Sequence, residues 1–320
     1  MTIRYITEAD VAASLDVPTA IELLDRAARA LAAGEAMSMP RQRPRTGKTT
    51  MQVLPAAYAG RLGHKVYLTG VPRGGVRFWV TLYDAESGMM LAMLEADVLG
   101  QIRTGAASGL ATRVMARADA RIGAVIGTGR QAGTQLEAIC RVRPLEVVRV
   151  SSRNAERGQS FCAAMRTRVG AQIEYVPDGA AAVRDADVVC TITNAADPVL
   201  LGAWLKPGAH VNAAGSNHAT RREIDAEVAR RAAVIAVEDV AQAKVESGDL
   251  LGAEREGAFA WDRALRLADI VAGAPARTGA EQITLFESLG VGLWDVAAAN
   301  HVYDRCVATG RGREVDLTGS

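Results

Sequence analysis

The chain has 320 residues, of which 49% are hydrophobic and 23% charged, a composition typical of globular domains and long enough for two of them. Lysine and arginine number 37 against 36 aspartate and glutamate residues, so no excess of positive charge favours binding to a nucleic acid. The N-terminus does not resemble a signal peptide, no apolar stretch reaches the roughly 20 residues that span a bilayer, and the four cysteines are widely spaced, which together predict a cytoplasmic protein with free thiols.

The first hundred residues predict helix followed by antiparallel strands. Residues 7–10 are expected to cap a short turn, and residues 18–33 carry apolar side chains at helical spacing up to Gly34. Three short runs rich in β-branched or aromatic residues then predict a meander of hairpins, at residues 64–69, 76–83 and 89–95, with turns at 70–75 and 84–88. This region is therefore predicted to be α+β.

From residue 104 onward the pattern changes to alternating helix and strand. A helix is predicted at residues 104–115, and six strands follow, at residues 122–126, 146–151, 173–176, 187–193, 210–214 and 233–237. Residues 220–223 have the sequence of a capping box and are expected to open one of the intervening helices. Six strands with helical crossovers predict a Rossmann-type, doubly wound parallel sheet.

The end of the chain predicts a return to the first domain. Residues 285–309 have helical periodicity, as one long amphipathic helix or two short ones. The predicted fold class is therefore α/β, with a discontinuous domain and a continuous one. Residues 1–113 and 297–320 form the α+β domain for substrate binding and dimerisation, and residues 114–296 form the Rossmann domain for a dinucleotide.

A glycine loop follows the first strand of the predicted parallel sheet. It comprises Gly127, Thr128, Gly129, Arg130, Gln131 and Ala132. In this context the first glycine permits a tight turn, the second lets the backbone approach a pyrophosphate, and the alanine keeps the helix close to its strand. The free amides of the helix N-terminus then bind the phosphates, so the loop predicts a dinucleotide cofactor.

The choice of cofactor depends on the residues after the second strand. An acidic residue there would bind the ribose 2′-hydroxyl of NAD, but this chain has Ser152, Arg153 and Asn154. An arginine suits a 2′-phosphate, so NADP(H) is favoured and NAD(H) remains possible. Three further residues are predicted to contact the cofactor: Thr104, and Thr193 and Asn194 at the end of the fourth strand.

Six segments, in order along the chain, resemble the ornithine cyclodeaminase/μ-crystallin family. They are residues 65–67, 102–111, 127–132, 202–215, 222–225 and 246–249. The resemblance implies a homodimer built through the N-terminal domain, beside a Rossmann domain, and a small amino- or imino-acid substrate. Activities in such families include ornithine cyclodeamination, alanine dehydrogenation and reduction of cyclic imino acids. Members similar to μ-crystallin bind NADPH and can serve as hormone-binding proteins.

The resemblance also implies which residues bind the substrate carboxylate. Arg41, Lys65 and Arg103 stand where the family places these ligands, and a guanidinium presents paired donors to a carboxylate. Other roles stay open for two of them. Arg41 is one of three arginines in a short segment and could lie at the surface, and Lys65 could be a lysine on a sheet edge.

Two positions depart from the cyclodeaminase pattern. Asn217 stands where those enzymes carry an aspartate, and Gln52, before a turn expected at Pro55, stands where they carry a glutamate. An amide does not accept a proton near neutral pH, whereas release of ammonia needs proton transfers. Reduction of a C=N bond needs hydride and one proton source, for which Lys65 is the candidate and His218 the alternative.

Three functions therefore remain open. The leading one is an NAD(P)H-dependent reductase or dehydrogenase acting on a small imino or amino acid, with a cyclic imine such as Δ1-pyrroline-2-carboxylate as one substrate. The second is an ornithine cyclodeaminase-type lyase that recycles its own NAD. The third is a non-catalytic protein of μ-crystallin type that binds NADPH or another ligand. No metal site is expected, because the histidines lack the spacing of metal ligands.

Overall fold

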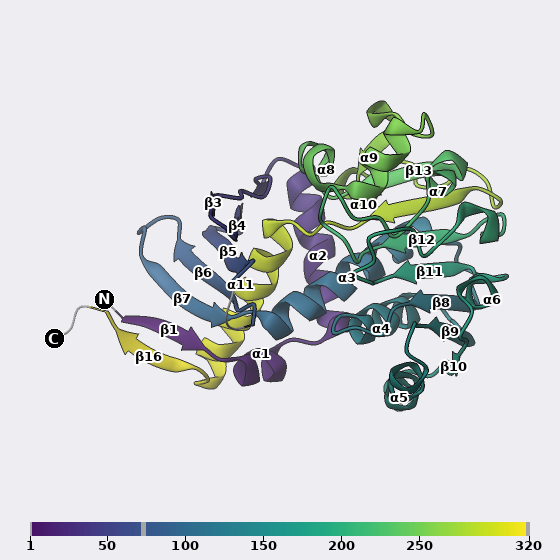
Figure 1. The fold of residues 1–320 in the computed structure, drawn as a ribbon. Helices are drawn as coiled ribbons and strands as arrows, with labels where there is room; N and C mark the ends of the chain where they lie inside the picture. The colour runs from purple at the N-terminus through teal and green to yellow at the C-terminus, as the bar shows by residue number, and fades with distance from the viewer. Residues whose placement is uncertain (1, 72–74, 318–320) are drawn as a thin grey trace. The chain divides into compact units, whose positions relative to one another are not determined.

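The computed structural model describes residues 2–71 and 75–317 (Figure 1). The chain forms two compact units, of which unit 1 comprises Met1–Arg103 and Val291–Ser320 and unit 2 comprises Thr104–Gly290. The sequence placed these boundaries after residues 113 and 296, somewhat later in the chain. The assignment of substrate binding and dimerisation to one domain, and of the cofactor to the other, stays a prediction.

Unit 1 is built on a mixed sheet. Its strands are β1 (Thr2–Ile6), β2 (Met37–Ser38), β3 (Arg45–Thr46), β4 (Thr49–Tyr58), β5 (Arg61–Thr69), β6 (Phe78–Asp84), β7 (Met90–Glu95) and β16 (Arg313–Asp316). Their order is β16-β1-β7-β6-β5-β4-β2, with β3 also paired to β4. The predicted hairpin strands are present as β5, β6 and β7, and part of the turn predicted at 70–75 lies outside the described residues. The turn expected at Pro55 is wrong, because this proline lies inside β4 opposite His64 of β5.

The helices of unit 1 begin where the sequence provides caps. Thr7 forms a capping box with Asp10 at the start of α1 (Glu8–Ser14), and Asp16 caps α2 (Val17–Ala32). The chain leaves α2 through Gly34, whose φ of +78° suits glycine. Helix α3 (Asp97–Met115) begins before the predicted residue 104, and the boundary between the two units falls within it.

The C-terminal helix α11 (Gly292–Thr309) packs against β4, β5 and β6, so the chain returns to unit 1 as expected. The prediction of helix from residue 285 is wrong, because Ile283–Glu287 forms strand β15 of unit 2. All five residues of β15 are buried. A strand buried on both faces does not alternate apolar and polar residues, and the adjacent Leu285 and Phe286 also fit the helical periodicity that continues into α11.

Unit 2 contains the predicted parallel sheet. Its strands are β8 (Ile122–Ile126), β9 (Val147–Ser151), β10 (Gln172–Tyr175), β11 (Val188–Thr191), β12 (His210–Ala213), β13 (Ala232–Val237), β14 (Ala264–Arg266) and β15. The order β10-β9-β8-β11-β12-β15-β13-β14 reverses direction at β8, which is the arrangement of a Rossmann-type sheet. The six predicted strands are confirmed, and β14 and β15 are additional.

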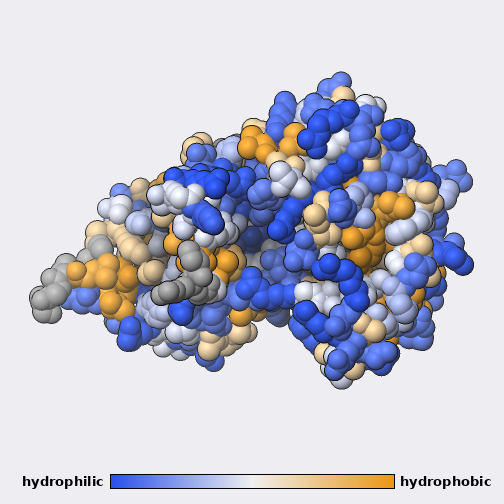
Figure 2. All heavy atoms as spheres, in the orientation of Figure 1, coloured by the Kyte–Doolittle hydropathy of each residue, from blue (hydrophilic) through white to orange (hydrophobic). Residues whose placement is uncertain are grey.

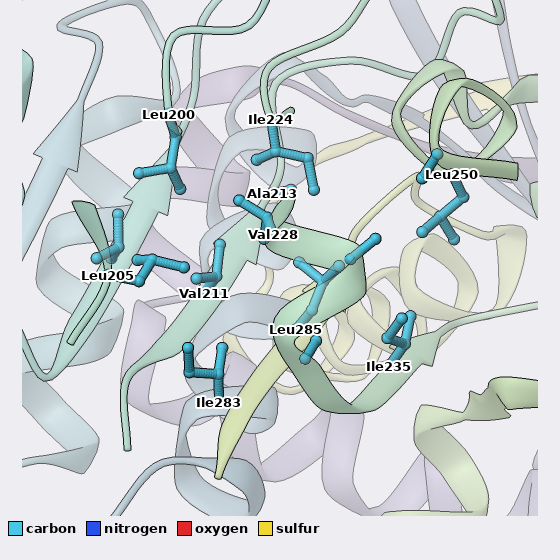
Figure 3. Close-up of a cluster of buried hydrophobic side chains, with 14 of the residues drawn as sticks. Leu200, Leu205, Val211, Ala213, Ile224, Val228, Ile235, Leu250, Ile283 and Leu285 are labelled. Atoms are coloured by element: carbon cyan, nitrogen blue, oxygen red, sulfur yellow. The ribbon is translucent and has the colours of Figure 1, made fainter. Parts of the chain in front are cut away.

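Helices cover both faces of this sheet. They are α4 (Ala132–Val142), α5 (Ala155–Arg166), α6 (Gly179–Val183), α7 (Ala226–Arg231), α8 (Val240–Glu246), α9 (Gly248–Arg255) and α10 (Leu267–Val271), with short 3-10 turns at Gly202–Trp204 and Trp261–Arg263. Leu136 of α4 and Met165 of α5 belong to the apolar core on one face. Val228 of α7 and Leu250 of α9 belong to the core on the other, which also contains Leu285 of β15 (Figure 3). This sandwich makes the sheet doubly wound.

The capping box expected at residues 220–223 is wrong. Helix α7 begins at Ala226 and is capped by Asp225, whose side chain accepts a hydrogen bond from the amide of Val228. The carboxylate of Glu223 is buried instead and takes part in a different network.

The described residues contain no helix that is both long and apolar enough to cross a bilayer. The four cysteines are free, as the spacing predicted, and the cytoplasmic location stays a prediction.

Candidate functional site

The glycine loop connects the end of β8 to the start of α4. Gly127 has a φ of +114°, and a Cβ atom there would lie 2.4 Å from the carbonyl oxygen of Ile192. Gly129 is exposed and has no atom within 4 Å of the corresponding position. Ala132 is fully buried against the sheet, and Gln131 gives α4 no side-chain cap. The loop therefore has the properties of a pyrophosphate cradle, with one glycine needed for the turn and the other open to a ligand.

Residues 152–154, directly after β9, include one cation and no carboxylate. The side chain of Asn154 caps α5 by accepting a hydrogen bond from the amide of Arg157 at 2.8 Å. The hydroxyl of Ser152 donates to the backbone carbonyl of Asn154 at 2.9 Å. Arg153 is exposed. Two of the three predicted residues thus shape the turn, and Arg153 is the one that presents charge to solvent.

The segments after β11 and β12 contain four further predicted residues, Thr193, Asn194, Asn217 and His218. The hydroxyl of Thr193 accepts a hydrogen bond from the amide of Ala195 at 3.1 Å, and Asn194 is exposed. Asn217 is partly exposed. His218 is exposed, with its Nδ1 atom 2.9 Å from the hydroxyl of Thr220.

Thr104 begins unit 2 and lies close to helix α4. Its carbonyl accepts a hydrogen bond from the side-chain amide of Gln135 at 3.3 Å. A Cβ atom on the next residue, Gly105, would lie 2.4 Å from the carbonyl oxygen of Thr134. Helices α3 and α4 thus approach each other closely at the side of the glycine loop.

A buried carboxylate that the sequence analysis missed connects the ends of β11 and β12. Glu223 is fully buried, and its oxygens accept hydrogen bonds from the hydroxyl of Thr191 at 2.8 Å and from the amides of Thr193 at 2.5 Å and Gly215 at 2.6 Å. Burial raises the pKa of Glu223, and these hydrogen bonds oppose the rise. The segments at this edge of the sheet are therefore held by one side chain.

Unit 1 contains a separate cluster of buried cations. Lys65 on β5 and Arg103 on α3 are 3% and 8% exposed, and the guanidinium of Arg41 donates to the hydroxyl of Tyr67 at 2.5 Å. The charges of Arg103 and Arg41 both act on the ammonium of Lys65. The ammonium also lies 5.0 Å from the ring centre of Phe78. The structure therefore brings the three predicted carboxylate ligands together in one unit.

Asp295 on α11 is the counter-ion of this cluster. Its Oδ1 atom accepts hydrogen bonds from Nζ of Lys65 at 3.1 Å and from Nε of Arg103 at 2.9 Å. Asp295 is fully buried. Two buried cations, Lys65 and Arg103, thus share one carboxylate oxygen, and an organic carboxylate would complete their charge balance.

Burial also changes the acidity of Lys65. The pKa of its ammonium is lowered to about 8, mainly by loss of solvation, and the nearby charges of Arg103 and Arg41 add to this lowering while Asp295 opposes it. Lys65 is not on a sheet edge, because β5 is paired with β4 on one side and β6 on the other. The group is therefore poised to exchange a proton near neutral pH.

Gln52 lies on β4 with its side chain buried. Its oxygen accepts a hydrogen bond from Nε of Arg43 at 2.9 Å, and its amide nitrogen donates to the hydroxyl of Thr69 at 3.3 Å. Both ends of the amide are thus engaged. In this position it supplies a neutral group, where a carboxylate would form an ion pair with Arg43.

A model of the ornithine cyclodeaminase/mu-crystallin family matches residues 4–310. The chain belongs to this family. The Delta(1)-pyrroline-2-carboxylate reductase of Bacillus cereus is 36% identical over 240 residues, which cover 74% of each chain. The structure of the Thermococcus litoralis Delta(1)-pyrroline-2-carboxylate reductase in complex with NADH and L-proline matches with a TM-score of 0.92 and 30% identity, over 98% of this chain and 100% of the other. An archaeal alanine dehydrogenase dimer with bound NAD matches with a TM-score of 0.93 and 28% identity, over 99% and 100%.

Membership of the ornithine cyclodeaminase/mu-crystallin family confirms the resemblance carried by the sequence motifs. The two solved structures contain a nicotinamide cofactor, which agrees with the cradle formed by the glycine loop of this family member. Two buried carboxylates, Asp295 and Glu223, were missed. An aspartate inside the apolar run around Trp294 was a signal for the first, whereas Glu223 resembled an ordinary helix cap.

An added methyl group is expected to affect stability at one glycine of the loop and cofactor binding at the other. Gly127→Ala forces a positive φ on alanine and a contact with the Ile192 carbonyl, so we expect the free energy of unfolding to fall by at least about 1–3 kcal/mol. Gly129→Ala meets open space, so we expect stability to change by less than about 1 kcal/mol while the Kd for the dinucleotide rises about tenfold or more. Urea unfolding and fluorescence titration measure these quantities. Unchanged binding by Gly129→Ala would contradict a role for this loop as the phosphate cradle.

Proposed function

We propose that the protein is an NAD(P)H-dependent reductase that converts a small α-imino acid into the corresponding amino acid. A cyclic imine such as Δ1-pyrroline-2-carboxylate, which would give proline, is the preferred substrate. The observation that carries this proposal is the buried cluster of Lys65, Arg103 and Asp295, with Arg41 beside it, on a chain with the glycine loop of a dinucleotide-binding sheet. Relatives that act on this imine add support.

The residues of unit 1 suit the two tasks that the reaction leaves to the protein. Arg41 and Arg103 bind the substrate carboxylate, and their guanidinium groups fix its orientation. Lys65 donates a proton to the imine nitrogen. The bound nicotinamide supplies the hydride that the α-carbon receives, so the C=N bond becomes a C–N bond with one N–H and one C–H added. Burial of the cluster excludes water from the charged groups.

A cyclodeaminase is less well supported by the same residues. Release of ammonia needs groups that accept and return protons, and the positions of the two missing carboxylates hold amides. The oxygen of Gln52 is already bonded to Arg43. Asn217 lies on a partly exposed segment of unit 2. A non-catalytic ligand-binding protein has no specific support, because the lowered pKa of Lys65 suits proton transfer.

One assay separates the three functions. The purified protein is mixed with NADPH or NADH and Δ1-pyrroline-2-carboxylate, and separately with ornithine and NAD⁺. We expect loss of absorbance from the reduced cofactor in the first mixture, together with formation of proline. Ammonia release from ornithine without net reduction of NAD⁺ would instead establish a cyclodeaminase, and no turnover in either mixture would favour a binding protein.

The pKa of Lys65 predicts how the reaction depends on pH. The protonated ammonium is the proton donor, so kcat/KM should be constant below about pH 8 and fall tenfold per pH unit above it. Asp295→Asn removes the anion that raises this pKa, so the alkaline limb should move to lower pH. Lys65→Met should lower kcat by about 10²–10⁴-fold.

These pH profiles also identify the group responsible. An alkaline limb that stays at the same pH in Asp295→Asn would belong to the substrate or to another residue, such as His218. Unchanged turnover by Lys65→Met at saturating substrate would remove the lysine from the mechanism.

We propose that NADP(H) is the preferred cofactor and that Arg153 is the reason. Its exposed guanidinium follows β9, where an acidic residue would select the ribose hydroxyl of NAD. Arg153→Ser should therefore raise the Kd for NADPH about tenfold and leave the Kd for NADH within twofold. A higher affinity of the wild-type protein for NADH than for NADPH would contradict this preference.

We also propose a homodimer formed through the sheet of unit 1. Helix α11 covers the face that carries Gly63 and Lys65, whereas Leu62, Leu68 and Met51 on the opposite face are 48%, 40% and 41% exposed. Hydrophobic side chains are also visible on the surface of this unit in Figure 2. Such exposure of large apolar residues is typical of an interface.

Light scattering tests the homodimer. The wild-type protein should have the molar mass of two chains, and Leu62→Glu combined with Leu68→Glu should give the mass of one. A monomeric wild-type protein at micromolar concentration would contradict the proposal.

A further inference from the structure

The ends of β11 and β12 are joined through the carboxylate of Glu223. One carboxylate oxygen accepts the amide of Thr193, and the other accepts both the amide of Gly215 and the hydroxyl of Thr191. Thr191 is the last residue of β11, Thr193 follows it, and Gly215 follows the neighbouring strand β12. The side chain therefore sets how the two chain segments leave the sheet.

Glu223 is itself held in place by a second buried carboxylate. Asp249, at the start of α9, accepts the backbone amides of Glu223 at 2.8 Å and of Ile224 at 2.9 Å. The space around the Glu223 carboxylate is also closed, because a Cβ atom on Gly215 would lie 2.4 Å from its Oε1 atom. The position of the Glu223 carboxylate is thus fixed both by the hydrogen bonds from its own backbone to Asp249 and by the close packing around its side chain.

The segment bonded to Glu223 is the one that contacts the glycine loop. A Cβ atom on Gly127 would lie 2.4 Å from the carbonyl oxygen of Ile192 and 3.1 Å from Cγ2 of Thr193. Strand β11 is also the neighbour of β8 at the point where the strand order reverses. Dinucleotides bind outside the carboxyl ends of the strands at this point of a doubly wound sheet.

We propose that Glu223 is a positioning residue that fixes the segments around Thr193 and Gly215 in the conformation that receives the dinucleotide. This inference rests on the proposed function for the reaction but concerns a side chain that does not itself touch substrate or cofactor. It acts through the backbone of the two segments. Loss of the carboxylate should therefore weaken cofactor binding without changing the cationic cluster of unit 1.

An amide cannot replace this carboxylate. Its three partners include two backbone N–H groups, which only donate, and a hydroxyl, which can rotate to accept. In Glu223→Gln the new NH₂ group faces either the amide of Thr193 or that of Gly215, whichever way the side chain is turned. One backbone N–H then loses its acceptor in a buried site, and the segment that carries it must move.

The chain provides a matched control in Asp187, another buried carboxylate of unit 2. It accepts the backbone amides of Arg121 at 2.8 Å and Ile122 at 2.9 Å, and it pairs with Arg117 and Lys206. These residues lie at the opposite, amino-terminal edge of the same sheet. Asp187→Asn should therefore destabilise unit 2 without moving the segments that Glu223 holds.

The experiment compares the wild-type protein, Glu223→Gln and Asp187→Asn. Hydrogen–deuterium exchange in the cofactor-free protein should become faster at residues 192–195 and 214–217 in Glu223→Gln and stay unchanged there in Asp187→Asn. The Kd for NADH or NADPH, measured by fluorescence well below the melting temperature, should rise about tenfold or more in Glu223→Gln and less than twofold in the control. The KM for the imino acid at saturating cofactor should be unchanged in both variants.

If Glu223→Gln does not fold, Thr191→Val takes its place in the binding experiment. It removes one of the three hydrogen bonds and leaves both amides paired, so the Kd for the dinucleotide should rise by a smaller factor, about two- to fivefold. Equal Kd values for Glu223→Gln and the wild type, or an equal increase in Asp187→Asn, would overturn the inference, as would an unchanged Kd in Thr191→Val where that variant is used. Because exchange and binding are measured without substrate, a wild-type protein that fails to reduce imines would refute the proposed function alone.

Discussion

One carboxylate oxygen, Oδ1 of Asp295, makes it possible for unit 1 to bury two cations. Lys65 and Arg103 both donate to it, and without it each would be a charge removed from water with no partner. Breaking such a buried pair costs about 3–5 kcal/mol. One carboxylate does not neutralise two cations, and the charge of Arg41 also acts on the ammonium of Lys65. Unit 1 thus holds more buried positive charge on Lys65 and Arg103 than Asp295 balances, which favours binding of a small anion and lowers the pKa of the lysine.

Two buried carboxylates of unit 2 have a different role. Glu223 and Asp249 accept hydrogen bonds mainly from backbone amides, so they organise the chain instead of pairing with cations. Burial raises the pKa of both, that of Asp249 to about 7. The roles of Asp295 in unit 1 and of Glu223 and Asp249 in unit 2 therefore differ. Asp295 allows unit 1 to bury cations that can bind an anion, and Glu223 and Asp249 fix the backbone at one edge of the sheet of unit 2.

Local patterns in the sequence were enough to predict much of the fold. The hairpins of unit 1 have alternating strands between turns, and β8 is followed by the glycine loop and α4, so neighbouring residues determine each element. Strand β15 was missed because burial on both faces removes alternation. Asp295 and Glu223 were missed for another reason. Asp295 lies 230 residues from Lys65, and Glu223 lies 30 residues from Thr193, so their partners are defined only by the tertiary structure.

The return of α11 to unit 1 has a consequence for biosynthesis. Unit 2 is continuous in sequence and its synthesis is complete before that of α11, whereas the sheet of unit 1 also needs α11, which follows unit 2 in the chain. Until then its buried lysine lacks Asp295. Domains normally mature in the order of translation. Here the earliest residues to be synthesised are among the last to reach their final structure, so a nascent chain stalled near its end would carry a finished nucleotide fold beside an open sheet.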